Sequence, residues 1–191
     1  TLFRSSLRQL GLDVSREENQ LRQISAQSGV LPGQTSGETE RRNYLEARWL
    51  VRQLALRNPL LDFDDLLLAT SAPGRWSHMS DQYLGWWSQP GGGLSVLENF
   101  KSAQPRLRPL ISALPPGNVL RPDISYDAKR VLFAWCRYYP GLSEQPDKLD
   151  KSKLPEDSFY HLFEMNLDGT GLRQLTHGKY NDFDGRYLPD G

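Results

Sequence analysis

The chain has 191 residues, which is enough to bury the core of one domain, or of one domain with an appendage. Its 23 Lys and Arg residues balance 23 Asp and Glu residues, so it lacks the basic excess of proteins that bind nucleic-acid phosphates, and we expect no nucleic-acid partner. The single cysteine excludes an internal disulfide, a cysteine zinc cluster and a c-type haem attachment motif from this stretch. The sequence has no run of 18 apolar residues, so we predict no transmembrane segment.

Residues 1–58 lack strand signals and predict a helical N-terminal segment with two helical patterns. The second pattern begins near Glu38 and ends before Pro59, because proline stops a helix. One apolar stripe runs along it, which we expect to be core packing: Tyr44, Leu45, Trp49, Leu50 and Leu54.

Residues 59–191 change to short β-rich runs broken by Gly, Pro, Asp and Asn, which is typical of antiparallel sheet. Three pairs of segments resemble one another at offsets of about 65, 67 and 63 residues. They are "LLLATSA" with "VLFAWCR", "LSVLEN" with "HLFEMN", and "LRPDISYDAK" with "FDGRYLPDG".

This weak repeat predicts two equivalent units, at about residues 64–129 and 130–191. Each is expected to hold an apolar strand, a long polar insertion, two further strands and an Asp-rich turn that leads into the next unit. The predicted fold class is mainly β: the N-terminal part of a β-propeller, with about two blades, preceded by a helical segment. Since two blades cannot close a ring, we expect a portion of a longer protein, or edges covered by the helical segment.

The stretch "NLDGTGLRQLTHGKYNDFDGRYLPDG" resembles the repeat of TolB-type β-propellers, with an Asp-Gly hairpin, an "LT" strand end and a "PDG" turn in that order. Residues 45–191 more widely resemble propeller-bearing proteins of planctomycete bacteria that are related to the middle region of the hydrazine synthase alpha subunit. This resemblance implies a propeller fold and a periplasmic or otherwise exported setting. Haem chemistry does not transfer, because the stretch has no Cys-x-x-Cys-His motif.

The most unusual segment is "GRWSHMSDQYLGWWSQPGGG", residues 74–93, where polar and aromatic side chains are concentrated. Aromatic residues either pack the segment onto the helices or line a site where a ligand stacks. A metal site is a further alternative, but two ligands, His78 and Asp81, are too few, and we predict neither metal nor cofactor. The candidate ligand-binding residues, held by Trp76 as well, are His78, Asp81, Gln82, Tyr83, Trp86 and Trp87.

The aspartates of the two Asp-rich segments are expected to accept backbone N–H groups in turns, with calcium binding as the alternative. These residues are Asp123, Asp127, Asp182, Asp184 and Asp190. Alternation places Cys136 and His161 in strands, as a buried structural thiol and a packed imidazole. Residues 143–158 mix both charge signs with two prolines and predict a surface loop.

These patterns favour a noncatalytic β-propeller module that serves as a ligand-binding or protein-interaction platform in a larger exported protein. Its partner would be an unknown protein or a small molecule. The alternative is the propeller portion of an enzyme, for example a redox enzyme, with its catalytic centre at the propeller mouth or downstream of residue 191. We assign no catalytic residue, because Gly-x-Ser-x-Gly is absent and only three histidines are present.

Overall fold

The computed structural model describes residues 7–28, 37–72, 84–147 and 150–190. The chain divides into two compact units. The helical unit comprises residues 1–64 and 101–103, and the β unit comprises residues 65–100 and 104–191. None of the described helices is long and apolar enough to cross a lipid bilayer.

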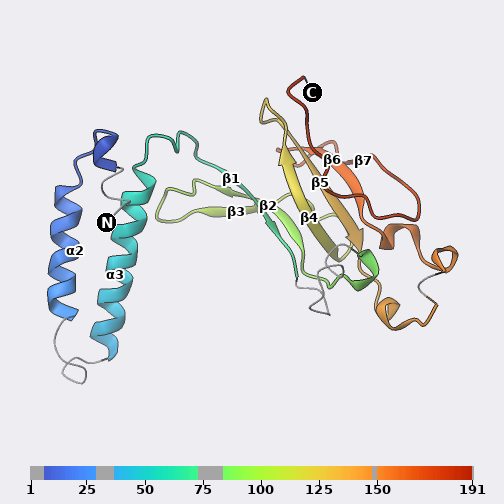
Figure 1. Cartoon of the computed structure of the whole chain (residues 1–191), viewed down its shortest axis with the longest axis horizontal. Coiled ribbons are helices and arrows are strands. Elements are labelled where there is room, and N and C mark those ends of the chain that lie inside the picture. Colours follow the sequence, from blue (N-terminus) through green and yellow to red (C-terminus); the bar gives the residue numbers. More distant parts are fainter. Residues whose placement is uncertain (1–6, 29–36, 73–83, 148–149, 191) are drawn as a thin grey trace. The chain divides into compact units, whose positions relative to one another are not determined.

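The helical unit includes α2 (Ser15–Ser28) and α3 (Gly37–Leu56), and residues 7–9 are helical as well (Figure 1). The carboxylate of Asp13 accepts a hydrogen bond from the Ser15 N–H at 3.0 Å, so it satisfies one of the unpaired donors at the start of α2. That bond, together with one from the Ser15 side chain, lowers the pKa of Asp13. Two acidic residues in the first turn of each helix complement the positive end of the helix dipole.

The apolar stripe predicted for α3 is only partly buried. Leu50 and Leu54 are buried, together with Asn43, whereas the side chains predicted to lie beside them are exposed. The exposed fractions are 63% for Tyr44, 54% for Leu45 and 41% for Trp49. The steps of seven and four residues between positions 43, 50 and 54 define one narrow buried face, where Leu54 packs with Leu7 and Val14. The prediction that the whole stripe is core packing was therefore wrong.

The β unit is mainly sheet, as predicted, and consists of two antiparallel sheets. The first contains β1 (Leu66–Thr70), β2 (Gly93–Glu98) and β3 (Arg106–Pro109). The second contains β4 (Gly117–Ile124), β5 (Arg130–Arg137), β6 (His161–Asn166) and β7 (Arg173–Gln174). Strands that are consecutive in sequence are neighbours in each sheet. All α-helices of the described chain end before residue 60, which confirms that prediction.

The core of the β unit contains side chains from both sheets. Phe163 stacks on Phe133 with ring centroids 5.9 Å apart and meets Trp135 edge to face at 5.6 Å. The buried members of this cluster are Leu94, Val96, Leu110, Ile111, Val119, Val131, Phe133, Trp135, Phe163 and Met165.

Strand pairing supports an internal repeat of three strands. Val96 pairs with Leu67 and Arg108 in the first sheet, and Phe163 pairs with Phe133 and Gln174 in the second. Val96 and Phe163 both face the core, so the equivalent residues are 67 and 133, 96 and 163, and 108 and 174. The offsets are then 66, 67 and 66 residues. The first predicted offset, 65, was one residue short, which would turn every side chain of a strand to the opposite face.

The boundary between the sheets differs from the predicted unit boundary at residue 129. Residues 117–124 form β4, which pairs with β5, so the sheets are divided between residues 109 and 117. The predicted Asp-rich turn at 120–129 is therefore partly strand. The composition of this segment predicted a turn because proline usually ends a strand. Here Pro122 lies in a β-bulge, where the register shifts between Leu120 and Asp123 and Arg121 has a φ angle of 41°.

Candidate functional site

Two long connections within the β unit, here called insertion one and insertion two, arise at equivalent places in the two sheets. Insertion one, residues 71–92, joins β1 to β2, and insertion two, residues 138–160, joins β5 to β6. Gly92 N–H donates to the carbonyl oxygen of Gly117 at the start of β4, so the stem of insertion one lies at the end of the second sheet from which insertion two emerges. Both insertions therefore belong to one end of the β unit.

Insertion one carries the predicted ligand-binding residues. Trp76, His78, Asp81, Gln82 and Tyr83 lie outside the described residues. The remaining two, Trp86 and Trp87, form a 3-10 turn with Gly85 and are half-buried.

Trp86 packs insertion one against insertion two. Its ring meets Phe159 edge to face, with the ring planes at 82° and the centroids 5.6 Å apart. Leu142 and Leu154, also from insertion two, complete a buried apolar cluster. Residues 143–158, predicted as a surface loop, are thus anchored by apolar side chains and contain short 3-10 turns. The geometry therefore supports a packing role for Trp86 over a ligand-stacking role. The residues that it packs against come from insertion two, whereas the sequence predicted the helices.

Close backbone contact fixes the turn of Gly85. A Cβ atom at this position would lie 1.8 Å from the carbonyl oxygen of Ser158, so only glycine fits without a backbone shift. The side-chain oxygen of Asn181 accepts hydrogen bonds from the Gly85 N–H at 3.1 Å and from the Tyr160 N–H at 3.0 Å. One amide thereby ties insertion one to insertion two.

Below this turn lie two acidic groups that stay protonated at neutral pH. Burial raises the pKa of the Cys136 thiol to about 11. Burial, followed by the neighbouring Cys136, raises the pKa of the Tyr160 phenol as well. The thiol is fully buried, as predicted, and its sulfur is 4.0 Å from the carbonyl oxygen of Gly85. A neutral buried thiol is a packing group and a poor nucleophile.

His161 is also buried, with 1% of its surface exposed, which confirms its predicted packing. Its Nε2 lies 3.1 Å from the carbonyl oxygen of Glu156, and a carbonyl only accepts, so we assign the donor role in this contact to Nε2. Nδ1 faces the Asp182 carboxylate at 3.6 Å. Both ring nitrogens are directed into the protein, so this imidazole is not presented to a ligand.

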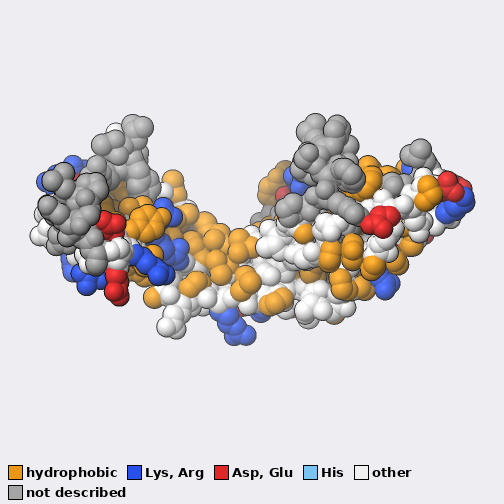
Figure 2. All heavy atoms as spheres, turned by 90° about the horizontal axis from the view of Figure 1, so that it is seen from below, with side chains coloured by type: hydrophobic (Ala, Val, Ile, Leu, Met, Phe, Trp, Pro, Cys, Tyr) orange, Lys and Arg blue, Asp and Glu red, His pale blue; other side chains and the backbone are white. Residues whose placement is uncertain are grey.

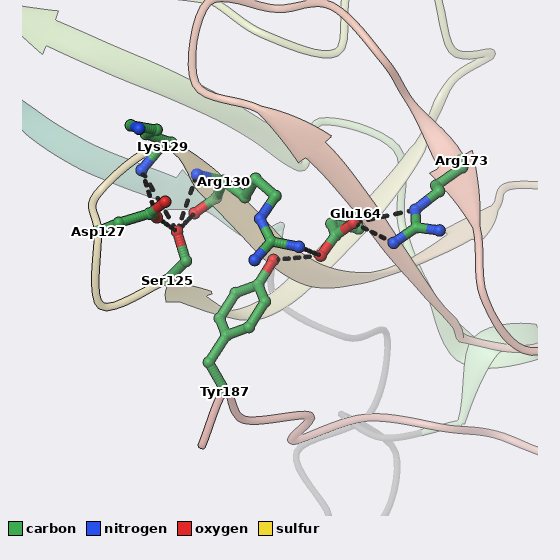
Figure 3. A network of polar contacts seen from close by, with 7 residues as sticks. All are labelled: Ser125, Asp127, Lys129, Arg130, Glu164, Arg173 and Tyr187. Carbon is green, nitrogen blue, oxygen red and sulfur yellow. Dashed lines mark hydrogen bonds and ion pairs between the residues drawn. The ribbon is translucent and has the colours of Figure 1, made fainter. Parts of the chain in front are cut away.

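The sequence analysis did not identify Glu164 on β6, whose carboxylate is the centre of a polar network (Figure 3). One carboxylate oxygen accepts from the Tyr187 hydroxyl at 2.8 Å and from Arg130 at 3.2 Å. The other accepts two N–H groups of Arg173, at 2.9 and 2.6 Å. Burial opposes ionisation of Glu164, but the hydrogen bonds from Arg173 and Tyr187 and the charges of the two arginines outweigh it and lower the pKa.

This network joins β5, β6 and β7 to the C-terminal segment that carries Tyr187. Arg173 is the direct cross-strand partner of Glu164, and the Arg130 guanidinium lies 5.5 Å from the Tyr187 ring centroid. The alternation of "HLFEMN" places Glu164 on the face opposite to Phe163, which was the one signal available in the sequence. Because each acceptor oxygen is occupied, the network stabilises the sheet and leaves no free acid or base.

The prediction that the aspartates accept backbone N–H groups in turns is confirmed for Asp127 alone; Asp123 accepts a backbone N–H from a distant segment, and Asp184 pairs with an arginine side chain. Asp127 accepts from the Ser125 hydroxyl at 2.6 Å and from the Lys129 N–H at 3.2 Å in the β4–β5 turn, which lowers its pKa (Figure 3). Asp123 accepts from the Tyr187 N–H at 2.9 Å, and Asp184 pairs with Arg121 at 2.5 Å. Within the described ranges, no three His, Cys, Asp or Glu side chains group as metal ligands.

A cavity of about 390 Å³ lies at the insertion end of the β unit. Its described lining residues are Gly91 to Ser95, Pro109, Ile111, Ser112, Leu114 to Gly117 and Trp135. None of them is charged, so the cavity suits an uncharged group. The glycines in its wall are tightly packed against neighbouring residues. A Cβ at Gly92 would lie 2.3 Å from the Asn118 side-chain oxygen, and one at Gly117 would lie 2.5 Å from the Trp135 indole nitrogen.

Comparisons of the chain with family models, with curated proteins and with solved structures found no match.

Proposed function

We propose that the β unit is part of a β-propeller and that its insertion end serves as a ligand-binding or protein-interaction platform in a larger exported protein. The observation that carries this proposal is the second sheet. Its four antiparallel strands follow one another in sequence order, which is the form of a propeller blade. The three strands β1 to β3 repeat the pairing of β5 to β7, so the same unit is used twice.

The position of the platform follows from the two insertions. Loops that emerge from one end of a rigid sheet are the usual carriers of binding residues. Trp86 of insertion one and Phe159 of insertion two pack against each other, so the described parts of the two insertions are in contact. The uncharged cavity beside Trp135 adds a concave site at the same end. The exported setting rests on the resemblance to TolB-type and planctomycete proteins.

The described groups favour binding over catalysis at this end. The Cys136 thiol is held protonated and the His161 ring is buried, so neither offers a reactive atom to a substrate. The polar residues of the platform, His78 and Asp81 foremost, are part of the proposal and are tested with it.

The test is quantitative affinity capture by the complete protein from the envelope fraction of its own organism. One variant replaces residues 74–83 by a Gly-Ser linker. The matched control is Tyr126→Ala, because Tyr126 is 70% exposed in the turn after β4, at the other end of the second sheet. We expect a saturable partner or small molecule that the linker variant loses and the control keeps.

Equal capture by all three forms would contradict the platform. Turnover of a captured small molecule by the complete protein, lost in the linker variant, would replace the platform with the enzyme alternative.

A further inference from the structure

The helical unit contains a separate concave site, a groove of about 650 Å³ that is lined by residues of both helices. Arg16 and Glu17 contribute from α2, and Trp49, Arg52 and Arg57 contribute from α3. The proposed function of the β unit does not use this groove.

The groove is strongly basic. Its lining holds Arg16, Arg52, Arg57 and Lys101, against a single carboxylate, Glu17. That carboxylate is already engaged, because one of its oxygens lies 2.8 Å from Arg57. Lys101 also lies 3.5 Å from the Asp64 carboxylate, so four cations and two anions leave an excess of two positive charges, and charge complementarity selects an acidic ligand.

The second carboxylate oxygen of Glu17 favours a ligand that carries a hydrogen-bond donor. It is buried and accepts no hydrogen bond among the described residues. Arg57 cannot turn toward it freely, since Arg57 also donates to the backbone oxygen of Asp13 at 2.9 Å. A buried acceptor without a donor is costly, so a ligand that brings an N–H group gains from filling this position. A simple anion such as sulfate offers only acceptors to it.

Exposed apolar side chains adjoin the charges. Trp49 lines the groove with 41% of its surface exposed, and the guanidinium of Arg52 lies 5.9 Å from its ring centroid. One turn earlier on α3, Tyr44 and Leu45 are more than half exposed. Figure 2 shows Lys and Arg side chains beside hydrophobic ones over the helical part of the chain. Trp, Tyr and Arg are the residue types that carry most binding energy at protein interfaces.

We propose that this groove binds an acidic peptide segment of a protein partner, in which carboxylates alternate with apolar side chains. The carboxylates pair with Arg16 and Arg52, an apolar side chain packs on Trp49, and a backbone N–H donates to the buried oxygen of Glu17. A peptide supplies all three complements at once. A lipid surface does not, because it is flat whereas the site is concave, and because it has no backbone N–H groups.

The test measures binding of a fluorescein-labelled peptide of alternating Glu and Leu to the whole chain by fluorescence anisotropy. We expect affinity to fall by about tenfold or more between about 50 mM and about 500 mM NaCl, because salt screens exposed charge pairs. Arg16→Gln and Trp49→Ala are each expected to weaken binding by about tenfold. Both side chains are exposed, so the variants retain the fold, which circular dichroism checks.

Arg22→Gln is the matched control, because Arg22 lies on α2 outside the groove lining and 73% of its side chain is exposed. It is expected to leave affinity within about twofold. The proposal is overturned if the wild-type chain does not bind the peptide at low salt, or if Arg22→Gln weakens binding as much as Arg16→Gln. It is also overturned if vesicles of phosphatidylcholine and phosphatidylserine bind through Arg16 and Trp49 while the peptide does not.

Discussion

Replacement of Glu164 by Gln removes one charge from the centre of the network that joins β5, β6 and β7, and changes the shape of the side chain little. The carboxylate accepts four hydrogen bonds, from Arg130, Arg173 and Tyr187. A glutamine keeps one acceptor oxygen, so the best orientation retains the paired N–H groups of Arg173 and turns the new NH₂ group toward the Tyr187 hydroxyl. Arg130 then faces a donor and loses its partner.

The size of the stability loss depends on how far water replaces the hydrogen bonds that each partner of Glu164 loses. Hydrogen bonds to a charged group contribute about 1.5–3 kcal/mol each when both groups are buried. Here the side chains of Arg173 and Arg130 are 63% and 38% exposed, so solvent replaces much of what they lose. We therefore expect Glu164→Gln to lower the free energy of unfolding of the β unit by about 2 kcal/mol at neutral pH.

The loss is expected to depend on pH with a definite sign. The pKa of Glu164 in the folded chain is lower than its ordinary value of 4.5, so its ionised form stabilises the fold. This stabilisation is fully present above pH 4.5 and is lost as the pH falls through the folded pKa. The difference between wild type and Glu164→Gln should be largest at about pH 7 and smaller at about pH 3.

Urea unfolding followed by circular dichroism at both pH values measures this difference. Asp190→Asn is the matched control, because it removes a carboxylate from the same unit at an exposed position that has no ion pair among the described residues. It should change stability little at either pH. A difference below about 0.5 kcal/mol at neutral pH, or one that is no smaller at about pH 3, would show that the ionised network does not stabilise the sheet.

Three further outcomes follow from the β unit. Cys136, with its pKa raised to about 11, should resist a thiol-reactive disulfide reagent in the native chain at mildly alkaline pH and react fully in urea; rapid native labelling would contradict its burial. Gly85→Ala, whose Cβ would lie 1.8 Å from a carbonyl oxygen, should lower the free energy of unfolding by about 3 kcal/mol, as measured by thermal unfolding. Gly37→Ala, with open space around its Cβ, should leave that free energy unchanged. Ala128→Gly should raise the free energy of unfolding by about 0.5 kcal/mol, because the φ angle of 54° at residue 128 is unfavourable for alanine. The control is Ala69→Gly in β1, and an equal loss of stability in both variants would refute this prediction.

Most strands of the β unit could be predicted because their signal is local. Alternating apolar residues and β-rich composition located β1, β2, β5 and β6 within one or two residues. β4 was not recognised, because Pro122 and Asp123 are residues that usually end strands, and the bulge that accommodates them is a property of the pairing with β5.

Side-chain contacts of the candidate site were harder to predict because they join distant parts of the chain. Trp86 and Phe159 are 73 positions apart, and no periodic pattern links them. Glu164 appeared as a single charge in an apolar strand, and its partner Tyr187 comes from a segment with no regular structure. For α3, the sequence identified the apolar side chains but not how many helices surround them, so burial was predicted for Tyr44 and Trp49, which are exposed.

The most direct measurement of the central proposal is a structure, by electron microscopy, of the complete protein bound to the partner that affinity capture identifies. We expect the sheet of β4 to β7 to be one of four to eight four-stranded sheets around a central channel, with the partner bound by residues 71–92 and 138–160. Two sheets packed as an isolated sandwich, or a partner bound at the end that carries the β4–β5 turn, would contradict it.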